Sequence, residues 1–172
     1  MTIRPARVEQ GTALQEIERL AGARFRDVGM DAVADAAPAS LEALGRYARA
    51  GRAWVAADEG CSPVGYILVD VVDGNAHVEQ VSVRPDKQGR GLGRALLDRV
   101  WVWAADRGKP AITLTTFTDV PWNRPLYERL GFSVLQETEI GPELSARRDA
   151  ETGHGLDPTT RVCMRRAVDG EM

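Results

Sequence analysis

Residues 81–94 read VSVRPDKQGRGLGR, and this stretch decides the fold. A segment with strand character at 76–83 ends just before Pro85, and a glycine-rich turn at 88–93 opens directly onto a segment with helical spacing. Glycines leave backbone N–H groups uncovered and let a ligand approach closely. The N-terminus of the following helix adds unpaired N–H donors and the positive end of the helix dipole. The stretch therefore predicts a strand, an anion-binding turn and a helix, with phosphate as the natural ligand.

Two common nucleotide-binding motifs do not fit this turn. The Walker motif GxxxxGK[ST] needs a lysine after the glycines, but the nearby Lys87 precedes them. The Rossmann fingerprint GxGxxG, counted from Gly89, would need a glycine where Arg94 stands. The acidic residue expected about 20 positions further on is also missing, because 113–116 read TLTT. This spacing disfavours a dinucleotide-binding oxidoreductase, and the pattern that fits is Q/R-x-x-G-x-G/A at 88–93.

With this pattern the sequence resembles the GNAT superfamily of acyl-CoA-dependent N-acetyltransferases. Two more segments carry the resemblance. Residues 78–85, VEQVSVRP, look like the fourth strand of the family, and 123–132, NRPLYERLGF, look like its Asn…(F/L)Y-x-x-x-GF signature. The three segments stand in the family's order and spacing. The resemblance implies an α/β fold with a central, mostly antiparallel mixed sheet, flanking helices, and a parallel pairing of the fourth and fifth strands.

Hydrophobic periodicity predicts further elements on both sides of these segments. Strands are expected at 3–8, 53–57, 63–72, 76–83, 111–117, 132–140 and 161–167. Helices are expected at 12–25, at 41–50 with Ser40 as N-cap, after Gly93 until Gly108, and from Pro125 to Gly131. A loop is expected at 31–39, and 141–160 forms a long connection with a helical-looking start. Antiparallel strands followed by βαβα elements indicate a mixed α/β sheet.

The composition is that of a globular protein. A chain of 172 residues matches the usual size of one domain, so we expect a single N-acetyltransferase domain over 1–172. A hydrophobic content of 44% is too high for a disordered chain. The 22 Lys and Arg face 25 Asp and Glu, so no excess of positive charge supports a nucleic-acid partner.

The cysteine content and the hydropathy of the sequence indicate the cellular compartment of the protein. Cys61 and Cys163 lie far apart and form no CxxC pair, which argues against a disulfide framework or a cysteine zinc site and favours a reducing compartment. The N-terminus lacks the apolar run of a signal peptide, and no stretch approaches the roughly 20 apolar residues of a membrane helix. We expect a cytoplasmic protein with no metal and no membrane partner.

The resemblance implies that acetyl-CoA is the co-substrate and that the turn holds its pyrophosphate through backbone donors. The residues so implied are Gln88, Gly89, Arg90, Gly91, Leu92 and Gly93. Arg90 and Arg94 either add positive charge or are ordinary solvated arginines. The alternative for the whole segment is a structural strand-to-helix turn, although such a turn rarely needs three glycines. The backbone groups of Val81 and Val83 are implied to pair with the pantetheine arm and to polarise the thioester carbonyl, as an oxyanion hole does.

Glu79 is the candidate general base. The acceptor amine must be neutral to attack, yet an alkylammonium has a pKa near 10.4, so a nearby carboxylate can attract it and remove its proton. The alternative is a strand glutamate that faces solvent or an arginine. His77 is a second candidate base, because strand alternation places His77, Glu79 and Val81 on one face if no bulge intervenes.

Tyr127 is the candidate general acid, at the position where the resemblance places the family's acid tyrosine. A phenol can supply the proton that the departing thiolate needs. The alternative is a helix tyrosine in the core. Asn123 would contact CoA in this family, or it could cap the helix that follows. Nothing near Cys61 or Cys163 supplies an activating histidine, so direct transfer is expected.

These observations favour an N-acetyltransferase that moves an acetyl group from acetyl-CoA to a primary amine of a small molecule or peptide. A non-catalytic acyl-CoA-binding domain of the same fold is the alternative. Glu79 and Tyr127 together favour the enzyme, since a binding domain needs neither. An antibiotic amine, a polyamine, an amino acid and a protein N-terminus all stay open as acceptors, and so does a homodimer, because dimers are common in this family.

Overall fold

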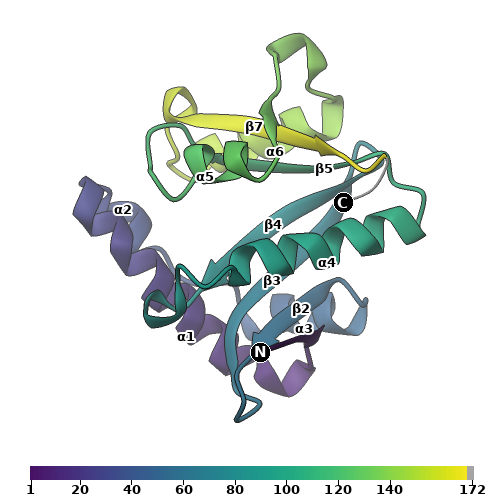
Figure 1. The fold of residues 1–172 in the computed structure, drawn as a ribbon. Helices are drawn as coiled ribbons and strands as arrows, with labels where there is room; N and C mark the ends of the chain where they lie inside the picture. Colours follow the sequence, from purple (N-terminus) through teal and green to yellow (C-terminus); the bar gives the residue numbers. More distant parts are fainter. Residues whose placement is uncertain (170–172) are drawn as a thin grey trace. The chain divides into compact units, whose positions relative to one another are not determined.

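The structure is a computed structural model and describes residues 1–169. Its described strands form one sheet of seven in the hydrogen-bonded order β1-β2-β3-β4-β5-β7-β6. The strands are β1 (Thr2–Pro5), β2 (Ala53–Ala57), β3 (Pro63–Val72), β4 (Asn75–Val83), β5 (Ala111–Phe117), β6 (Ser133–Val134) and β7 (Arg161–Ala167). Neighbouring strands pair antiparallel at β1/β2, β2/β3, β5/β7 and β6/β7, whereas β4 runs parallel to β5 (Figure 1). The predicted mixed α/β fold with one parallel pair is confirmed.

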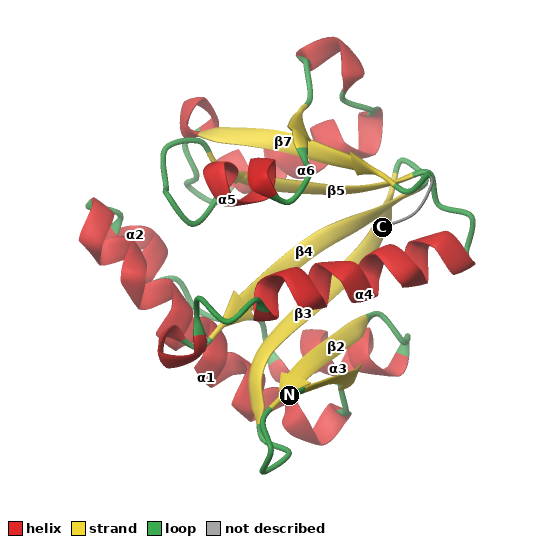
Figure 2. Cartoon of the chain, in the orientation of Figure 1, coloured by secondary structure: helices red, strands yellow, loops and turns green. Residues whose placement is uncertain are grey.

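Three helices follow β1, and from β4 onward helices alternate with the strands along the chain (Figure 2). They are α1 (Gly11–Gly22), α2 (Asp31–Ala34), α3 (Leu41–Arg49), α4 (Leu92–Asp106), α5 (Arg124–Arg129) and α6 (Pro142–Gly153). Ser40 caps α3 as predicted, since its Oγ accepts the N–H of Ala43 at 3.1 Å. Gly108 follows α4 with a φ of +65°, the left-handed conformation that glycine favours after a helix. Among the described residues, no helix has the length and apolar character needed to cross a bilayer.

The chain forms two compact units. The first unit comprises 1–69 and 79–99, and the second comprises 70–78 and the chain from 100 onward. The expectation of a single domain over 1–172 stays a prediction.

In the first unit, α1 and α3 pack against one face of β2 and β3. The core there contains Leu14 and Ile17 of α1, Leu44 of α3, Val55 of β2, and Tyr66 and Leu68 of β3. On the other face, the guanidinium of Arg99 in α4 lies 5.4 Å from the ring centroid of Trp54. Gly65 lets β3 pass close to β4, because a Cβ there would lie 3.1 Å from the carbonyl oxygen of Ser82. The sheet of this unit is therefore covered on both faces.

In the second unit, α6 covers one face of β5 and β7. Leu144 of α6 packs with Cys163 of β7 and Val72 of β3. The N-terminus of α6 is capped from the β3–β4 turn, where the Asp73 carboxylate accepts the N–H groups of Glu143 and Leu144, each at 3.0 Å. Gly141 permits this contact, because a Cβ at that position would overlap the carboxylate.

The expected strand 3–8 is too long, because β1 ends at Pro5. Residues 8–10 instead form a 3₁₀ turn, in which the Gln10 Oε1 accepts the N–H of Arg7 at 2.8 Å. The expected loop at 31–39 contains the short helix α2, in line with the high helix propensity of its alanines.

The C-terminal third differs more from expectation. The expected strand 132–140 shortens to the two residues of β6, since 137–139 form a 3₁₀ turn that Glu139 closes by accepting the N–H of Gln136 at 2.9 Å. The long connection 141–160 contains the twelve-residue helix α6. The cap on this helix comes from Asp73, so no local capping residue marks its start in the sequence.

Candidate active site

The glycine-rich turn lies in the first unit between β4 and α4. Gly89 and Gly91 have φ values of +76° and +78°, which glycine adopts at little cost. A Cβ built on Gly89, Gly91 or Gly93 would meet nothing within 4 Å. The space over all three glycines is therefore open, and a side chain at any of them would project into it.

The N-terminus of α4 supplies donors to this space. The carbonyl of Gly91 accepts the first bond of the helix, from the N–H of Ala95 at 2.9 Å. The N–H groups at 92–94 precede that bond and have no acceptor inside the helix. Leu92 is buried and anchors the turn, whereas Arg94 is exposed and lies 3.7 Å from the Asp98 carboxylate. Donors, helix dipole and arginines together suit a phosphate group.

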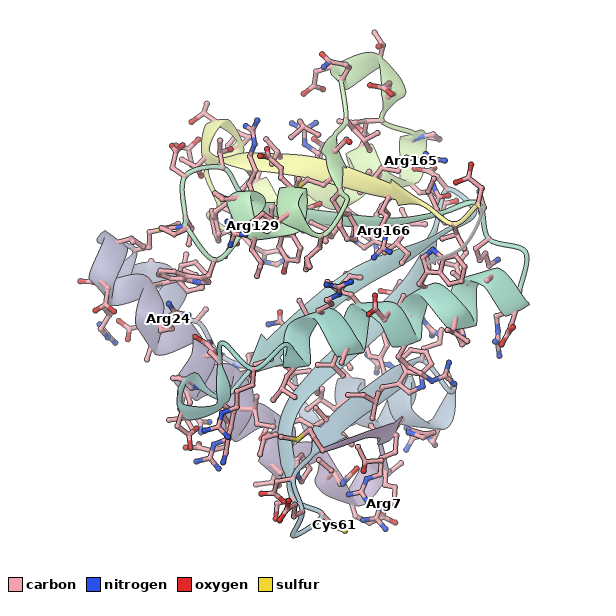
Figure 3. The ribbon with its side chains drawn as sticks, in the orientation of Figure 1. Arg7, Arg24, Cys61, Arg129, Arg165 and Arg166 are labelled. Atoms are coloured by element: carbon pink, nitrogen blue, oxygen red, sulfur yellow. The ribbon has the colours of Figure 1, made fainter. Side chains whose placement is uncertain are left out.

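The side chain of Gln88 holds the turn in place. Its Nε2 donates to the carbonyl of Val83 at 3.2 Å, and its Oε1 accepts from the guanidinium of Arg24. Arg24 belongs to the 3₁₀ segment Ala23–Val28 that follows α1, and Figure 3 labels it there. Gln88 therefore ties the turn both to the end of β4 and to the helical segment. Sequence reasoning missed Arg24, because no local spacing relates it to a residue so far along the chain.

Strand β4 carries three of the predicted site residues in the same unit. Glu79 is exposed, and Val81 and Val83 are half-buried. Between the two valines, Ser82 is buried and its Oγ accepts from the Nε2 of Gln80 at 2.7 Å. The first unit thus brings Glu79, Val81 and Val83 together with the turn at 88–94.

His77 lies in the second unit and differs sharply from Glu79 in burial. Its side chain is 2% exposed, and its Nδ1 lies 2.9 Å from the Oγ1 of Thr113. Burial, with a smaller contribution from the Arg147 guanidinium, lowers the pKa of His77 to about 4. An imidazole that is both inaccessible and weakly basic is a poor base for the acceptor amine. This environment disfavours His77 and leaves Glu79 as the candidate.

Asn123 and Tyr127 lie in the second unit at α5. The Oδ1 of Asn123 accepts from the Oγ1 of Thr116 at 2.5 Å and from the N–H of Phe117 at 3.3 Å. The side chain makes no cap bond, so the capping alternative is wrong, and the amide links α5 to the end of β5. Its Nδ2 takes no part in these bonds and is the group that could contact a cofactor.

The Tyr127 ring is half-buried and meets the ring of Phe132 edge-on, with centroids 5.8 Å apart. Desolvation raises the pKa of Tyr127 to about 12. The phenol therefore keeps its proton at neutral pH and can act as a hydrogen-bond donor.

Comparisons with known proteins agree on one family. The model of the acetyltransferase (GNAT) family matches residues 14–132. Peptidyl-lysine N-acetyltransferase YjaB of Salmonella typhimurium is 27% identical over 141 residues, which are 81% of this chain and 88% of that protein.

Solved structures share the fold at lower identity. The ribosomal-protein-S18-alanine N-acetyltransferase from Escherichia coli superimposes with a TM-score of 0.67 at 19% identity, covering 99% of this chain and 96% of the other. The PaiA N-acetyltransferase from Thermoplasma acidophilum, in complex with coenzyme A, gives a TM-score of 0.68 at 14% identity and covers 96% of this chain and 98% of the other.

Proposed function

The chain belongs to the acetyltransferase (GNAT) family and is an acyltransferase, and from this premise we propose that it moves the acetyl group of acetyl-CoA directly to a primary amine of a small molecule or peptide. The observation that carries the proposal is the open, three-glycine turn at the N-terminus of α4. Such a turn has backbone donors for a pyrophosphate and no side chain in the way. Coenzyme A is also present in the solved structure of the Thermoplasma acidophilum relative.

In this proposal, Glu79 prepares the acceptor. Its exposed carboxylate on β4 can attract an incoming alkylammonium and take a proton from it, directly or through one water. The backbone groups of Val81 and Val83 on the same strand pair with the pantetheine arm and stabilise the charge that develops on the thioester oxygen.

Tyr127 acts on the leaving group. A thiol has a pKa near 8.5, below the value of about 12 for this phenol, so complete proton transfer to the thiolate is uphill. A protonated phenol can still donate a hydrogen bond to the sulfur as negative charge develops on it. We therefore assign Tyr127 the role of a donor that stabilises the departing sulfur.

Direct transfer is supported by the state of the two cysteines. Cys61 is exposed on a turn, and Cys163 is buried, with burial raising the pKa of its thiol. Nucleophilic attack requires the thiolate, which a raised pKa disfavours. Cys163 is thus a poor candidate for carrying the acetyl group.

The names of two similar proteins support one class of acceptor. YjaB is named a peptidyl-lysine N-acetyltransferase, and the Escherichia coli neighbour is named for an alanine of a ribosomal protein. We propose a peptide amine, with the lysine side chain first, as the acceptor to test before polyamines and free amino acids.

The test measures release of free thiol from acetyl-CoA with lysine peptides, peptides with a free N-terminus, polyamines and free amino acids. Amine-dependent thiol release and an acetylated product, seen by mass spectrometry, are expected. Saturable binding of acetyl-CoA with no acceptor-dependent release across the panel would instead favour the non-catalytic acyl-CoA-binding domain.

A further inference from the structure

The second unit contains a cavity of about 230 Å³ that shares no residue with the turn at 88–94. Its polar lining comes from Asp73, Asn75, Thr113, Glu139 and Arg165, and Leu144 of α6 forms part of its wall. The volume is far above the roughly 30 Å³ that one water occupies and below the range of about 300–1,000 Å³ usual for drug-sized ligands. A metabolite of a few heavy atoms would fill it.

The strand register explains why polar groups gather there. Arg165 of β7 pairs with Thr113 of β5, and Thr113 pairs with His77 of β4, so the three side chains share one face of the sheet. Asn75, two residues before His77, joins the same face. A sheet face covered by a helix is usually apolar, and here several neighbouring strands each contribute a polar side chain.

One of these groups lacks a partner and is open to the cavity. The Oδ1 of Asn75 accepts no hydrogen bond within residues 1–169, but it has almost no accessible surface, so a molecule in the cavity does not reach it. Arg147, Arg148 and Arg161 of the same unit each pair with a carboxylate, whereas the half-buried Arg165 has no such partner within that described range.

The charges of the lining define the ligand. Arg165 offers a fork of donors that suits a carboxylate. The carboxylates of Asp73 and Glu139 suit a cationic donor, because each of those side chains presents oxygen. The same two carboxylates repel an anion with no positive group. A ligand that matches all of them carries one carboxylate and one ammonium close together.

We propose that this cavity binds a free α-amino acid, with its carboxylate on Arg165 and its ammonium on the carboxylates of Asp73 and Glu139. The site is assigned by the cavity, the unpaired Arg165 and these two carboxylates, and binding does not require acetyl-CoA.

The experiment is calorimetric titration of the full chain, without acetyl-CoA, with a panel of free amino acids. Acetate, methylamine and inorganic phosphate serve as probes that carry only part of the recognised chemistry. Saturable binding of at least one amino acid is expected, with acetate and methylamine at least tenfold weaker. Backbone amide shifts in a ¹⁵N spectrum should cluster at 113, 139–144 and 165, which separates this site from an acceptor amine bound near Glu79.

Variants provide the control. Arg165→Gln removes the unpaired guanidinium and should weaken amino-acid binding at least tenfold. Arg166→Gln removes the same charge from the same strand, where the two side chains lie on opposite sides of β7 (Figure 3), and should bind as the parent does. Thermal melts verify that both variants fold. If Arg165→Gln does not fold, Arg165→Lys replaces it, because lysine keeps the positive charge but lacks the forked pair of donors.

No binding by any amino acid would overturn the proposal and leave a cavity filled by water alone. Acetate or phosphate binding as tightly as the best amino acid would also overturn it, because the site would then recognise an anion only. An equal loss in Arg166→Gln would contradict the assigned residue.

Discussion

Lowering the pH from 7 to 5 should destabilise the folded protein through His77. The folded state holds this imidazole neutral, because burial lowers its pKa to about 4, whereas the unfolded chain has the ordinary value near 6.5. Between these two values the unfolded state binds a proton that the folded state does not. The stability that His77 contributes is therefore complete above about pH 6.5 and is lost as the pH falls toward 4.

The magnitude follows from the gap in pKa. A pH of 5 lies about 1.5 units below the pKa of the imidazole in the unfolded chain, so that imidazole is protonated. In the folded protein, where the pKa is about 4, the imidazole is still mostly neutral at pH 5. Each unit corresponds to about 1.4 kcal/mol, so the free energy of unfolding should fall by about 2 kcal/mol from this residue. The Nδ1 contact with Thr113 is replaceable by an amide, which makes His77→Gln the matching variant.

The assay is urea unfolding at pH 7 and pH 5 for the parent, His77→Gln and His154→Gln. His154 is exposed and serves as the control histidine. The parent and His154→Gln should lose about 2 kcal/mol more than His77→Gln on acidification. The same pH dependence in all three proteins would refute the argument that His77 stays neutral in the folded state and lowers the free energy of unfolding as the pH falls.

The remaining predictions concern α6 and catalysis. Gly141→Ala should lower the free energy of unfolding by about 1–3 kcal/mol, because its Cβ displaces the Asp73 carboxylate that caps α6. Gly153→Ala, at the other end of α6, should be neutral. Thermal melts distinguish the two variants, and equal melting temperatures would contradict the capping role of Asp73. Tyr127→Phe removes one hydrogen-bond donor to the departing sulfur, so it should reduce kcat by about 10²–10³-fold and leave the Kd for acetyl-CoA unchanged; unaltered turnover would move the donor role to water. Glu79→Gln should depress kcat/KM most at low pH, where the neutral amine is scarcest, and recover partly at high pH; a parental pH–rate profile would exclude Glu79 as the base.

Sequence patterns predicted the strands and the turn whose conformation depends on residues close together in the chain. The runs at 53–57, 63–72, 111–117 and 161–167 coincide with β2, β3, β5 and β7, because their apolar residues and flanking turns lie within the same few positions. The turn at 88–93 was predicted for the same reason, since three closely spaced glycines before a helical segment describe its backbone directly.

What the sequence did not predict depends on partners far along the chain. The cap of α6 comes from Asp73, and the bond that holds Gln88 comes from Arg24. Alternation along β4 says which residues share a face, but what covers that face is decided by tertiary packing, so the burial of His77 could not be foreseen. The polar cavity is likewise assembled from several strands and a helix, and no single segment reveals it.

The central claim is that the open turn before α4 binds acetyl-CoA, and calorimetric titration of acetyl-CoA into the parent, Gly93→Val and Gly153→Val tests it most directly. Both glycines are helical residues, and a side chain at either position would enter open space, so the two variants make the same chemical change in α4 and α6. The parent and Gly153→Val should bind alike, and Gly93→Val should bind at least tenfold more weakly, because its side chain enters the space that the pyrophosphate needs. Parental affinity in a folded Gly93→Val protein would contradict the claim.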